Sequence, residues 1–287
     1  MSRKSRRHFL KKLGGLVSGT VLASSNIFAA DKQPPLGLQL YTLRDEIKED
    51  LERTIRKISE IGYSGVETYF LPEKISLKET AELLDKYGLE VFAMHSELPT
   101  DQKKKDKILK RAELYNSKRV VWHGWPETDR FANLDKMKKT VERYNKVNKF
   151  LQKNGLELGL HNHWWEFEKV EGRYPFYYLL ENLDKDIFFE IDVYWTKTGG
   201  VDPVKALSDF GDRASLVHIK DGPATTGGKP IHEQVAVGQG NLDIEEICKA
   251  AQSHADWLIV ELDDCKTDIF EAIEDSYNYL TNNNLAG

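Results

Sequence analysis

The strongest constraint on the fold is a regular alternation of short apolar segments with longer amphipathic ones. Eight segments have the length and composition of β-strands: residues 36–41, 65–69, 90–94, 119–122, 156–161, 187–191, 215–219 and 257–261. Each is followed by a segment with apolar residues at helical spacing, at residues 48–61, 77–87, 101–115, 134–153, 175–183, 203–210, 244–252 and 269–280. This alternation predicts a parallel sheet that is covered by helices.

The length of the chain decides between the two common ways of arranging such a sheet. Eight strand-helix units in 287 residues match a closed barrel better than an open sheet. No linker rich in proline, glycine or serine divides the units, and no G-x-G-x-x-G motif follows the first strand, as an open dinucleotide-binding sheet would require. We therefore predict a single-domain α/β protein, a (β/α)8 TIM barrel over residues 31–287.

The first 30 residues are predicted to lie outside this fold. Residues 5–11 (SRRHFLK) resemble the twin-arginine export signal, and an uncharged stretch follows to Ala29 and Ala30, a plausible cleavage point. The stretch contains several glycines and serines, which argues against a membrane-spanning helix. We expect a signal peptide at residues 1–30, export to the periplasm, and no stable membrane insertion once the signal is removed.

Charge and cysteine content exclude some classes of partner and framework. The formal net charge of -5 argues against nucleic acid, because phosphate binding needs a basic face. The two cysteines lie too near the end of the chain for a disulfide framework. The oligomeric state stays open, with a homo-oligomer as one alternative.

Ionisable residues gather at the predicted carboxyl ends of the strands, where barrel enzymes carry their active sites. They are His95, His123, His161, His163 and His218, together with Glu67, Asp192 and Glu261. Ionisable groups are costly to bury without partners, and a divalent cation suits mixed imidazole and carboxylate ligands. Because the set contains no cysteine, it favours Mn, Zn, Co or Fe(II) as the metal.

Short motifs on successive strands resemble the xylose-isomerase-like superfamily of sugar isomerases and epimerases. They are residues 37–44 (GLQLYTLR), 160–163 (LHNH), 191–195 (IDVYW), 217–221 (VHIKD) and 260–261 (VE). Each motif is short, but their order along the expected strands covers nearly the whole chain after the leader. The resemblance implies a metal-dependent TIM barrel that acts on a small sugar-like molecule.

The resemblance also implies a set of metal ligands. Ketose 3-epimerase-like members hold the metal with Glu, Asp, His and Glu from strands five to eight, and Asp192, His218 and Glu261 match the last three. The fifth-strand glutamate is replaced by His161, which we expect to be the fourth ligand, with Glu166 from the following loop as the alternative. The histidine that those epimerases carry three residues after the sixth-strand aspartate is Trp195 here. These departures put symmetric epimerisation by two glutamates in doubt.

Such sites move a proton next to a carbonyl, with the metal stabilising an enediolate. We expect catalysis from Glu261, His163 and Glu166: Glu261 is the first candidate for the base, with His161 or His163 second. The predicted substrate-binding residues are Glu67, His95, His123, Trp195 and Lys220.

Three functions remain open from the sequence. The leading one is a metal-dependent sugar isomerase or epimerase; the second is a lyase or dehydratase acting on a keto-sugar, keto-glycoside or keto-inositol. The third is a non-catalytic exported sugar-binding protein. Aromatic residues crowd the expected barrel mouth, which suits a sugar ring. Because the chain has no dedicated phosphate loop, a non-phosphorylated substrate is preferred.

Overall fold

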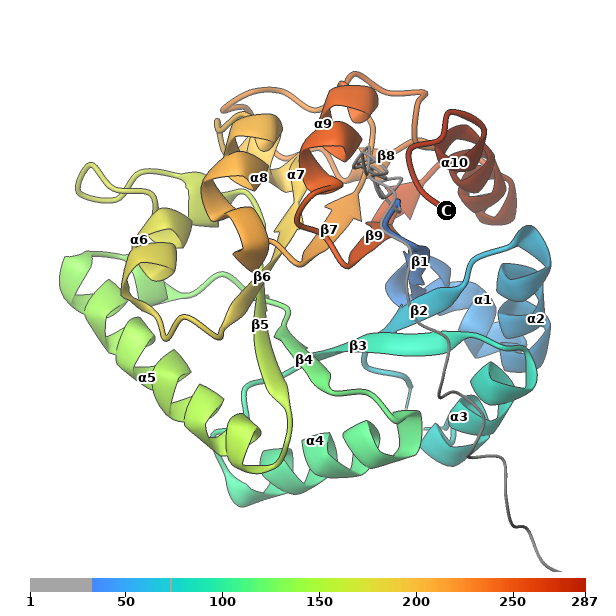
Figure 1. Cartoon of the computed structure of the whole chain (residues 1–287), viewed down its shortest axis with the longest axis horizontal. Helices are drawn as coiled ribbons and strands as arrows, with labels where there is room; N and C mark the ends of the chain where they lie inside the picture. Colours follow the sequence, from blue (N-terminus) through green and yellow to red (C-terminus); the bar gives the residue numbers. More distant parts are fainter. Residues whose placement is uncertain (1–32, 73) are drawn as a thin grey trace, which may run out of the picture. The chain divides into compact units, whose positions relative to one another are not determined.

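Eight parallel strands close into a barrel, as the alternation predicts. A computed structural model describes residues 33–72 and 74–287. The strands occur in the order β1-β2-β3-β4-β5-β6-β7-β9 around the ring (Figure 1). Their bounds are β1 Leu36–Gln39, β2 Gly65–Thr68, β3 Glu90–Ser96, β4 Arg119–Trp122, β5 Glu157–His161, β6 Phe188–Asp192, β7 Leu216–Ile219 and β9 Trp257–Val260.

The ring closes between its first and last strands. Leu36 of β1 pairs with Leu258 of β9, and Leu38 pairs with Val260. The end of the chain returns to the same place, where the Gly287 amide donates to the Pro34 carbonyl oxygen. These contacts leave the barrel without a free strand edge.

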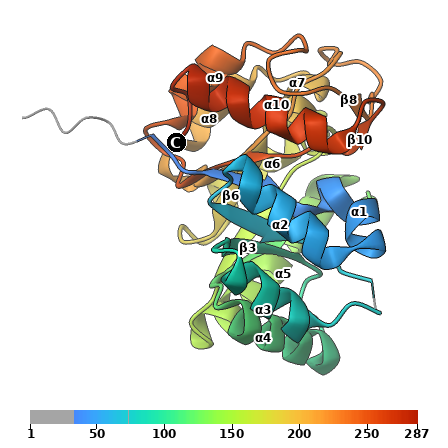
Figure 2. The ribbon, with the colours of Figure 1, turned by 90° about the vertical axis from the view of Figure 1, so that its right-hand side faces the viewer.

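Helices form the layer outside the strands. They are α1 Arg44–Glu49, α2 Leu51–Ile61, α3 Leu77–Lys86, α4 Gln102–Tyr115, α5 Leu134–Lys153, α6 Pro175–Asn182, α7 Val193–Thr198, α8 Pro203–Phe210, α9 Ile244–Ala251 and α10 Ile269–Asn282. On one flank α10, α2, α3 and α4 lie side by side (Figure 2). Two further short strands, β8 Glu233–Gln234 and β10 Asp264–Cys265, pair with each other in the loops that follow β7 and β9.

The sequence prediction lacks β8 and β10, and two α-helical segments also differ from it. The single helix expected at residues 48–61 is divided, because Asp50 is extended and its side chain accepts from the Arg53 amide as the N-cap of α2. Helix α7 was not predicted: Asp192 ends β6 and also caps α7 by accepting from the Trp195 amide. The sequence pattern predicts only a strand end and a loop there.

The barrel interior is divided into an apolar layer and a polar layer. The apolar layer contains Phe92, Ala93, Val121, Phe188, Leu216, Trp257 and Ile259. Gly159 makes room for it, since a Cβ at that position would lie 2.3 Å from the Phe188 ring. Residues two places further along three strands are Glu190, His218 and Glu261, so the polar layer lies toward the carboxyl ends of the strands.

The predicted signal peptide, residues 1–30, lies outside the described residues, so export stays a prediction. Among the residues that are described, no helix is both long and apolar enough to cross a membrane.

Candidate active site

A cavity of about 500 Å³ opens at the carboxyl ends of the strands. Aromatic and ionisable side chains line it: Tyr41, Tyr69, Phe70, His95, His123, Trp125, His161, His163, Trp195, His232, Glu261 and Asp263. Apolar walls with a few converging polar groups are typical of small-molecule sites. The polar layer of the barrel forms the floor of this cavity.

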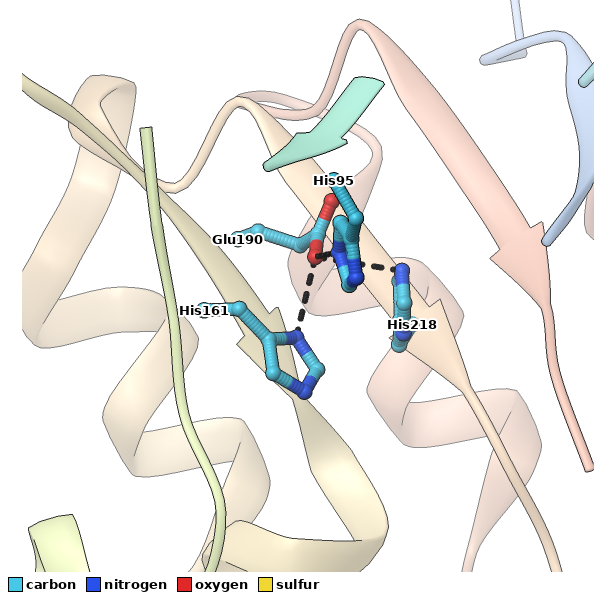
Figure 3. A group of neighbouring side chains, drawn as sticks. All are labelled: His95, His161, Glu190 and His218. Atoms are coloured by element: carbon cyan, nitrogen blue, oxygen red, sulfur yellow. Dashed lines mark hydrogen bonds and ion pairs between the residues drawn. The ribbon is translucent and has the colours of Figure 1, made fainter. Parts of the chain in front are cut away.

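Four buried side chains meet at one point beneath the cavity and are named here the deep group: His95, His161, Glu190 and His218 (Figure 3). Glu190 Oε2 lies 2.7 Å from His95 Nε2, 2.9 Å from His161 Nδ1 and 3.2 Å from His218 Nε2. The rings come from β3, β5 and β7 and the carboxylate from β6, so four strands supply one donor atom each.

Glu67 lies against the deep group. Its Oε2 atom is 2.8 Å from His218 Nε2 and accepts a hydrogen bond from Gln39 Nε2 at 2.7 Å. Burial, together with the nearby carboxylate of Glu190, raises the pKa of Glu67 to about 7. Glu67, predicted as a substrate contact, is fully buried and does not line the cavity.

A second group, named here the mouth group, consists of Asp192, His218 and Glu261. His218 Nδ1 lies 2.7 Å from Glu261 Oε2 and 4.0 Å from Asp192 Oδ2. Burial raises the pKa of Asp192 to about 6, against the opposing effect of Lys220. Three protein ligands with a free position are typical of catalytic metal sites.

Lys220 is buried beside the mouth group. Its Nζ atom lies 3.1 Å from Asp192 Oδ2, 2.8 Å from Glu261 Oε2 and 2.7 Å from Asp263 Oδ2. Burial lowers the pKa of Lys220, but these carboxylates outweigh burial and hold it well above its usual range. The ammonium group therefore stays charged and draws the mouth carboxylates together.

His218 joins the two groups, because its ring directs Nε2 to the deep group and Nδ1 to the mouth group. Burial lowers its pKa, yet Glu190 and Glu261 outweigh burial and raise the pKa well above its ordinary value. The same ring charge, with Lys220, holds the pKa of Glu261 well below the usual range although burial opposes this. Glu261 is thus an ionised carboxylate on the wall of the cavity.

Glu166 has a full set of partners away from the cavity. It accepts hydrogen bonds from Arg130 at 2.8 Å, from the Trp165 indole at 2.6 Å and from the His163 amide at 2.9 Å. Its side chain is 2% exposed and does not line the cavity. These contacts hold the 161–166 segment in place on the side of Glu166 away from the cavity.

The other predicted site residues lie at the cavity or next to it. His123, His163 and Trp195 line the wall, while Lys220 lies behind it. Burial lowers the pKa of His123 to about 3 and that of His163 well below its usual value, so both imidazoles are neutral.

The predicted ligand set of His161, Asp192, His218 and Glu261 is divided between the two groups. His161 contacts Glu190, whereas Asp192 and Glu261 lie on the other side of His218. Glu190 was not selected from the sequence. The sequence feature that indicates Glu190 is its position two residues before Asp192 on the same strand, which puts both side chains on one face.

Both groups have the chemistry of a divalent transition-metal site, because they combine imidazole and carboxylate donors. Several buried oxygens also lack a hydrogen-bond partner within residues 33–72 and 74–287, namely Glu67 Oε1, Glu190 Oε1 and Asp192 Oδ2. Asp192 Oδ2 is within ion-pair distance of Lys220 but not in hydrogen-bond geometry. A cation would satisfy these atoms, so the residues fit a metal ion.

Comparisons with known proteins identify the fold family. A family model described as "Xylose isomerase-like TIM barrel" matches residues 55–282. No curated protein has a sequence that matches this chain significantly.

Several solved structures share the fold. A sugar phosphate isomerase/epimerase from Parabacteroides distasonis is 24% identical, with a TM-score of 0.72 over 93% of this chain and 100% of that one. A probable 3-DHS dehydratase, AsbF, from Bacillus anthracis is 12% identical, with a TM-score of 0.67 over 86% and 98%. The IOLI protein with a bound zinc atom is 16% identical, with a TM-score of 0.65 over 86% and 97%.

Proposed function

The chain belongs to the xylose isomerase-like TIM barrel family, and from that premise we propose that it is a metal-dependent sugar isomerase or epimerase. The reaction moves a proton on the carbon next to a carbonyl, through an enediolate. The observation that carries the proposal is Glu261 on the cavity wall, which pairs with Lys220 at 2.8 Å and belongs to a group that fits a metal.

The mouth group is the proposed metal site, with His161 the predicted fourth ligand. Asp192 Oδ2, His218 Nδ1 and Glu261 are its donor atoms, and the IOLI protein with a bound zinc atom supports this assignment by likeness of fold. When bound, a divalent ion supplies a Lewis acid for the carbonyl oxygen of the substrate.

Glu261 is the proposed base. Its low pKa keeps it ionised at neutral pH, and its place on the cavity wall puts it within reach of a bound substrate. Lys220 fixes its position by an ion pair at 2.8 Å. A base that also faces a metal ion has to use its second oxygen for the proton, so Glu261 Oε1 is the atom expected to receive it.

His163 is the proposed second proton-handling group. Its ring is neutral, lies in the cavity wall and packs flat against Trp165, with 4.3 Å between ring centroids. Its Nδ1 atom has no partner among the described residues. The hydrogen bond from its amide to Glu166, which Arg130 holds, fixes the backbone at this point.

Recognition of a sugar-like, non-phosphorylated substrate is proposed for the remaining wall. Tyr69 Oη and Trp195 Nε1 are buried polar atoms of cavity-lining residues, and neither has a partner in the described part of the chain. Such donors suit sugar hydroxyl groups. Lys220 and Arg130, by contrast, are already paired with carboxylates, which leaves neither of them for a phosphate group.

The proposal is tested by following conversion of non-phosphorylated keto-sugars by NMR, with the protein loaded with Mn, Co, Zn or Fe(II), or stripped by a chelator. We expect conversion that disappears with the metal and returns on reloading. Glu261→Gln should reduce kcat by at least about 100-fold, as loss of a general base typically does. Conversion at an equal rate after complete metal removal would overturn the proposal.

A lyase or dehydratase is the second candidate. The neutral imidazoles of His161 and His163 favour it, because a neutral ring that takes the proton from carbon becomes an imidazolium, which can then give that proton to the leaving group. The likeness to a probable 3-DHS dehydratase is consistent with it. A dehydrated or cleaved product in the same NMR assay would select this candidate over isomerisation.

Export is proposed alongside the reaction. The resemblance of residues 5–11 to a twin-arginine signal supports transport of the folded protein to the periplasm. Such a route would let the chain acquire its metal before leaving the cytoplasm.

A further inference from the structure

The deep group contains more unpartnered polar atoms than a hydrogen-bonded network accounts for. Glu190 Oε2 faces three ring nitrogens, from His95, His161 and His218, while Glu190 Oε1 has no partner within the described residues. His161 Nδ1 is 2.9 Å from Glu190 Oε2 but not in hydrogen-bond geometry. Burying polar groups in this state is costly, and these residues are 0–8% exposed.

The charges of the deep group point to a cation. Glu67 and Glu190 are both fully buried, and burial of two carboxylates side by side is unfavourable unless positive charge lies between them. His218 supplies one positive charge, since its Nε2 atom lies 2.8 Å from Glu67 Oε2 and 3.2 Å from Glu190 Oε2. Lys220 adds none here, because it pairs with Asp192, Glu261 and Asp263. A divalent ion among the three rings and Glu190 would balance the two carboxylates.

The geometry of the donors also suits a metal ion. Donor atoms around a tetrahedral ion with bonds of about 2.0–2.1 Å lie about 3.3 Å apart. The separations from Glu190 Oε2 to the three ring nitrogens are 2.7, 2.9 and 3.2 Å, so an ion needs these separations to widen by about 0.1–0.6 Å. All four donor atoms lie within 4.8 Å of one another. Figure 3 shows the three rings directed toward this carboxylate from different strands.

From these observations we propose that the deep group, His95, His161, Glu190 and His218, binds a divalent transition-metal ion of its own. Three imidazoles and one carboxylate select Zn, Co, Ni, Cu or Fe(II) over Mg or Ca. Gln39 donates to Glu67 and so holds a second carboxylate against the bound ion. The site is reached from the cavity, because His95 and His161 line its wall.

The deep site and the mouth site share the ring of His218 through different nitrogens. An ion in each site would make this ring a bridge, and the charged ring would then release the protons of both its nitrogens to water. His161, which the sequence assigns to the mouth ion, serves the deep ion in this arrangement. The inference rests on the proposed function only for the presence of the mouth ion, and experiment can separate the deep site from the proposed function.

The test uses two matched double variants of the full chain, with Co(II) or Zn(II) alone as the probe. Asp192→Asn with Glu261→Gln removes mouth donors, and His95→Asn with Glu190→Gln removes deep donors. Bound metal is counted by equilibrium dialysis and elemental analysis, and Co(II) geometry is followed by visible absorption. We expect two ions per parent chain and one in each variant, with the ion of the mouth variant giving the absorption of a four-coordinate, nitrogen-rich site.

The outcomes separate the two assignments. Suppose that the parent holds one ion, which is lost in the mouth variant and kept at full affinity in the deep variant. This result overturns the deep site and leaves the proposed function standing. One ion lost only in the deep variant supports the deep site and overturns the mouth assignment. Should the deep variant fail to fold, anomalous diffraction at the zinc edge from parent crystals decides: a peak within bonding distance of His95 Nε2 and His161 Nδ1 is expected, and a peak only beside Asp192 and Glu261 refutes the inference.

Discussion

Lys220→Met removes the positively charged ammonium group of a buried side chain that contacts three carboxylates. Lys220 is 1% exposed, and its Nζ atom lies 2.7–3.1 Å from Asp192, Glu261 and Asp263. Removing one member of a buried ion-pair network costs about 3–5 kcal/mol, because the remaining charges are uncompensated. For a domain of this size that corresponds to a fall in Tm of about 6–20 °C.

The same variant reports on the mouth metal site. An ion that binds Asp192 and Glu261 replaces the missing positive charge, and ligand at 1,000 times its Kd stabilises the folded state by about 4 kcal/mol. Thermal melts in a chelator and in excess Zn(II) or Co(II) measure both effects. We expect the ion to raise the Tm of Lys220→Met by more than it raises that of the parent, since the competing ammonium is gone.

A matched control is Lys249→Met, which breaks an exposed pair with Glu245 on α9. Exposed pairs contribute at most about 1 kcal/mol, so this variant should melt close to the parent. The reasoning is refuted if Lys220→Met melts with the control, or if metal ions raise the Tm of the variant and of the parent equally.

Three further predictions concern the support of the site, the barrel interior and the leader. Arg130→Met leaves the buried Glu166 without its ion pair and should lower stability by about 3–5 kcal/mol in urea unfolding; adding Glu166→Gln should recover part of the loss, and an additive double variant would show that the pair is unimportant. Gly159→Ala places a Cβ against the Phe188 ring and should cost about 1–3 kcal/mol; Phe188→Leu in the same chain should relieve it, and unchanged stability of the single variant would disprove the close packing. Arg6→Lys with Arg7→Lys should retain the protein in the cytoplasm of a Gram-negative host, measured by cell fractionation, whereas unchanged export would exclude the twin-arginine route.

The barrel could be predicted from the sequence because each of its strands and helices has a recognisable pattern within its own residues. Each strand is a short apolar run and each helix has its own periodicity, so the units are visible one at a time. The division at Asp50 depends on one side chain that caps α2, and α7 depends on Asp192 acting as strand end and cap at once. Single-residue capping of this kind changes element boundaries without changing the surrounding pattern.

The candidate site could be predicted only in part, since its residues meet across the barrel. The carboxyl ends of the strands were identifiable, and so His95, His161 and His218 were selected. The pairing of Glu166 with Arg130, 36 residues apart, has no local signal in the sequence, and it directs this candidate catalytic carboxylate away from the cavity. Glu190 lies two residues before Asp192 and shares its face of β6, so period-two alternation is the one sequence signal that indicates it.

The measurement that tests the central claim most directly is incorporation of solvent deuterium into a keto-sugar at the carbon next to its carbonyl. The metal-loaded parent in D2O should exchange that hydrogen at least as fast as product forms, and Glu261→Gln should slow the exchange by about 100-fold or more, as expected for loss of a general base. Product formation by the metal-loaded parent with no solvent deuterium at that carbon in either substrate or product, or equal exchange by Glu261→Gln, would contradict proton transfer by Glu261.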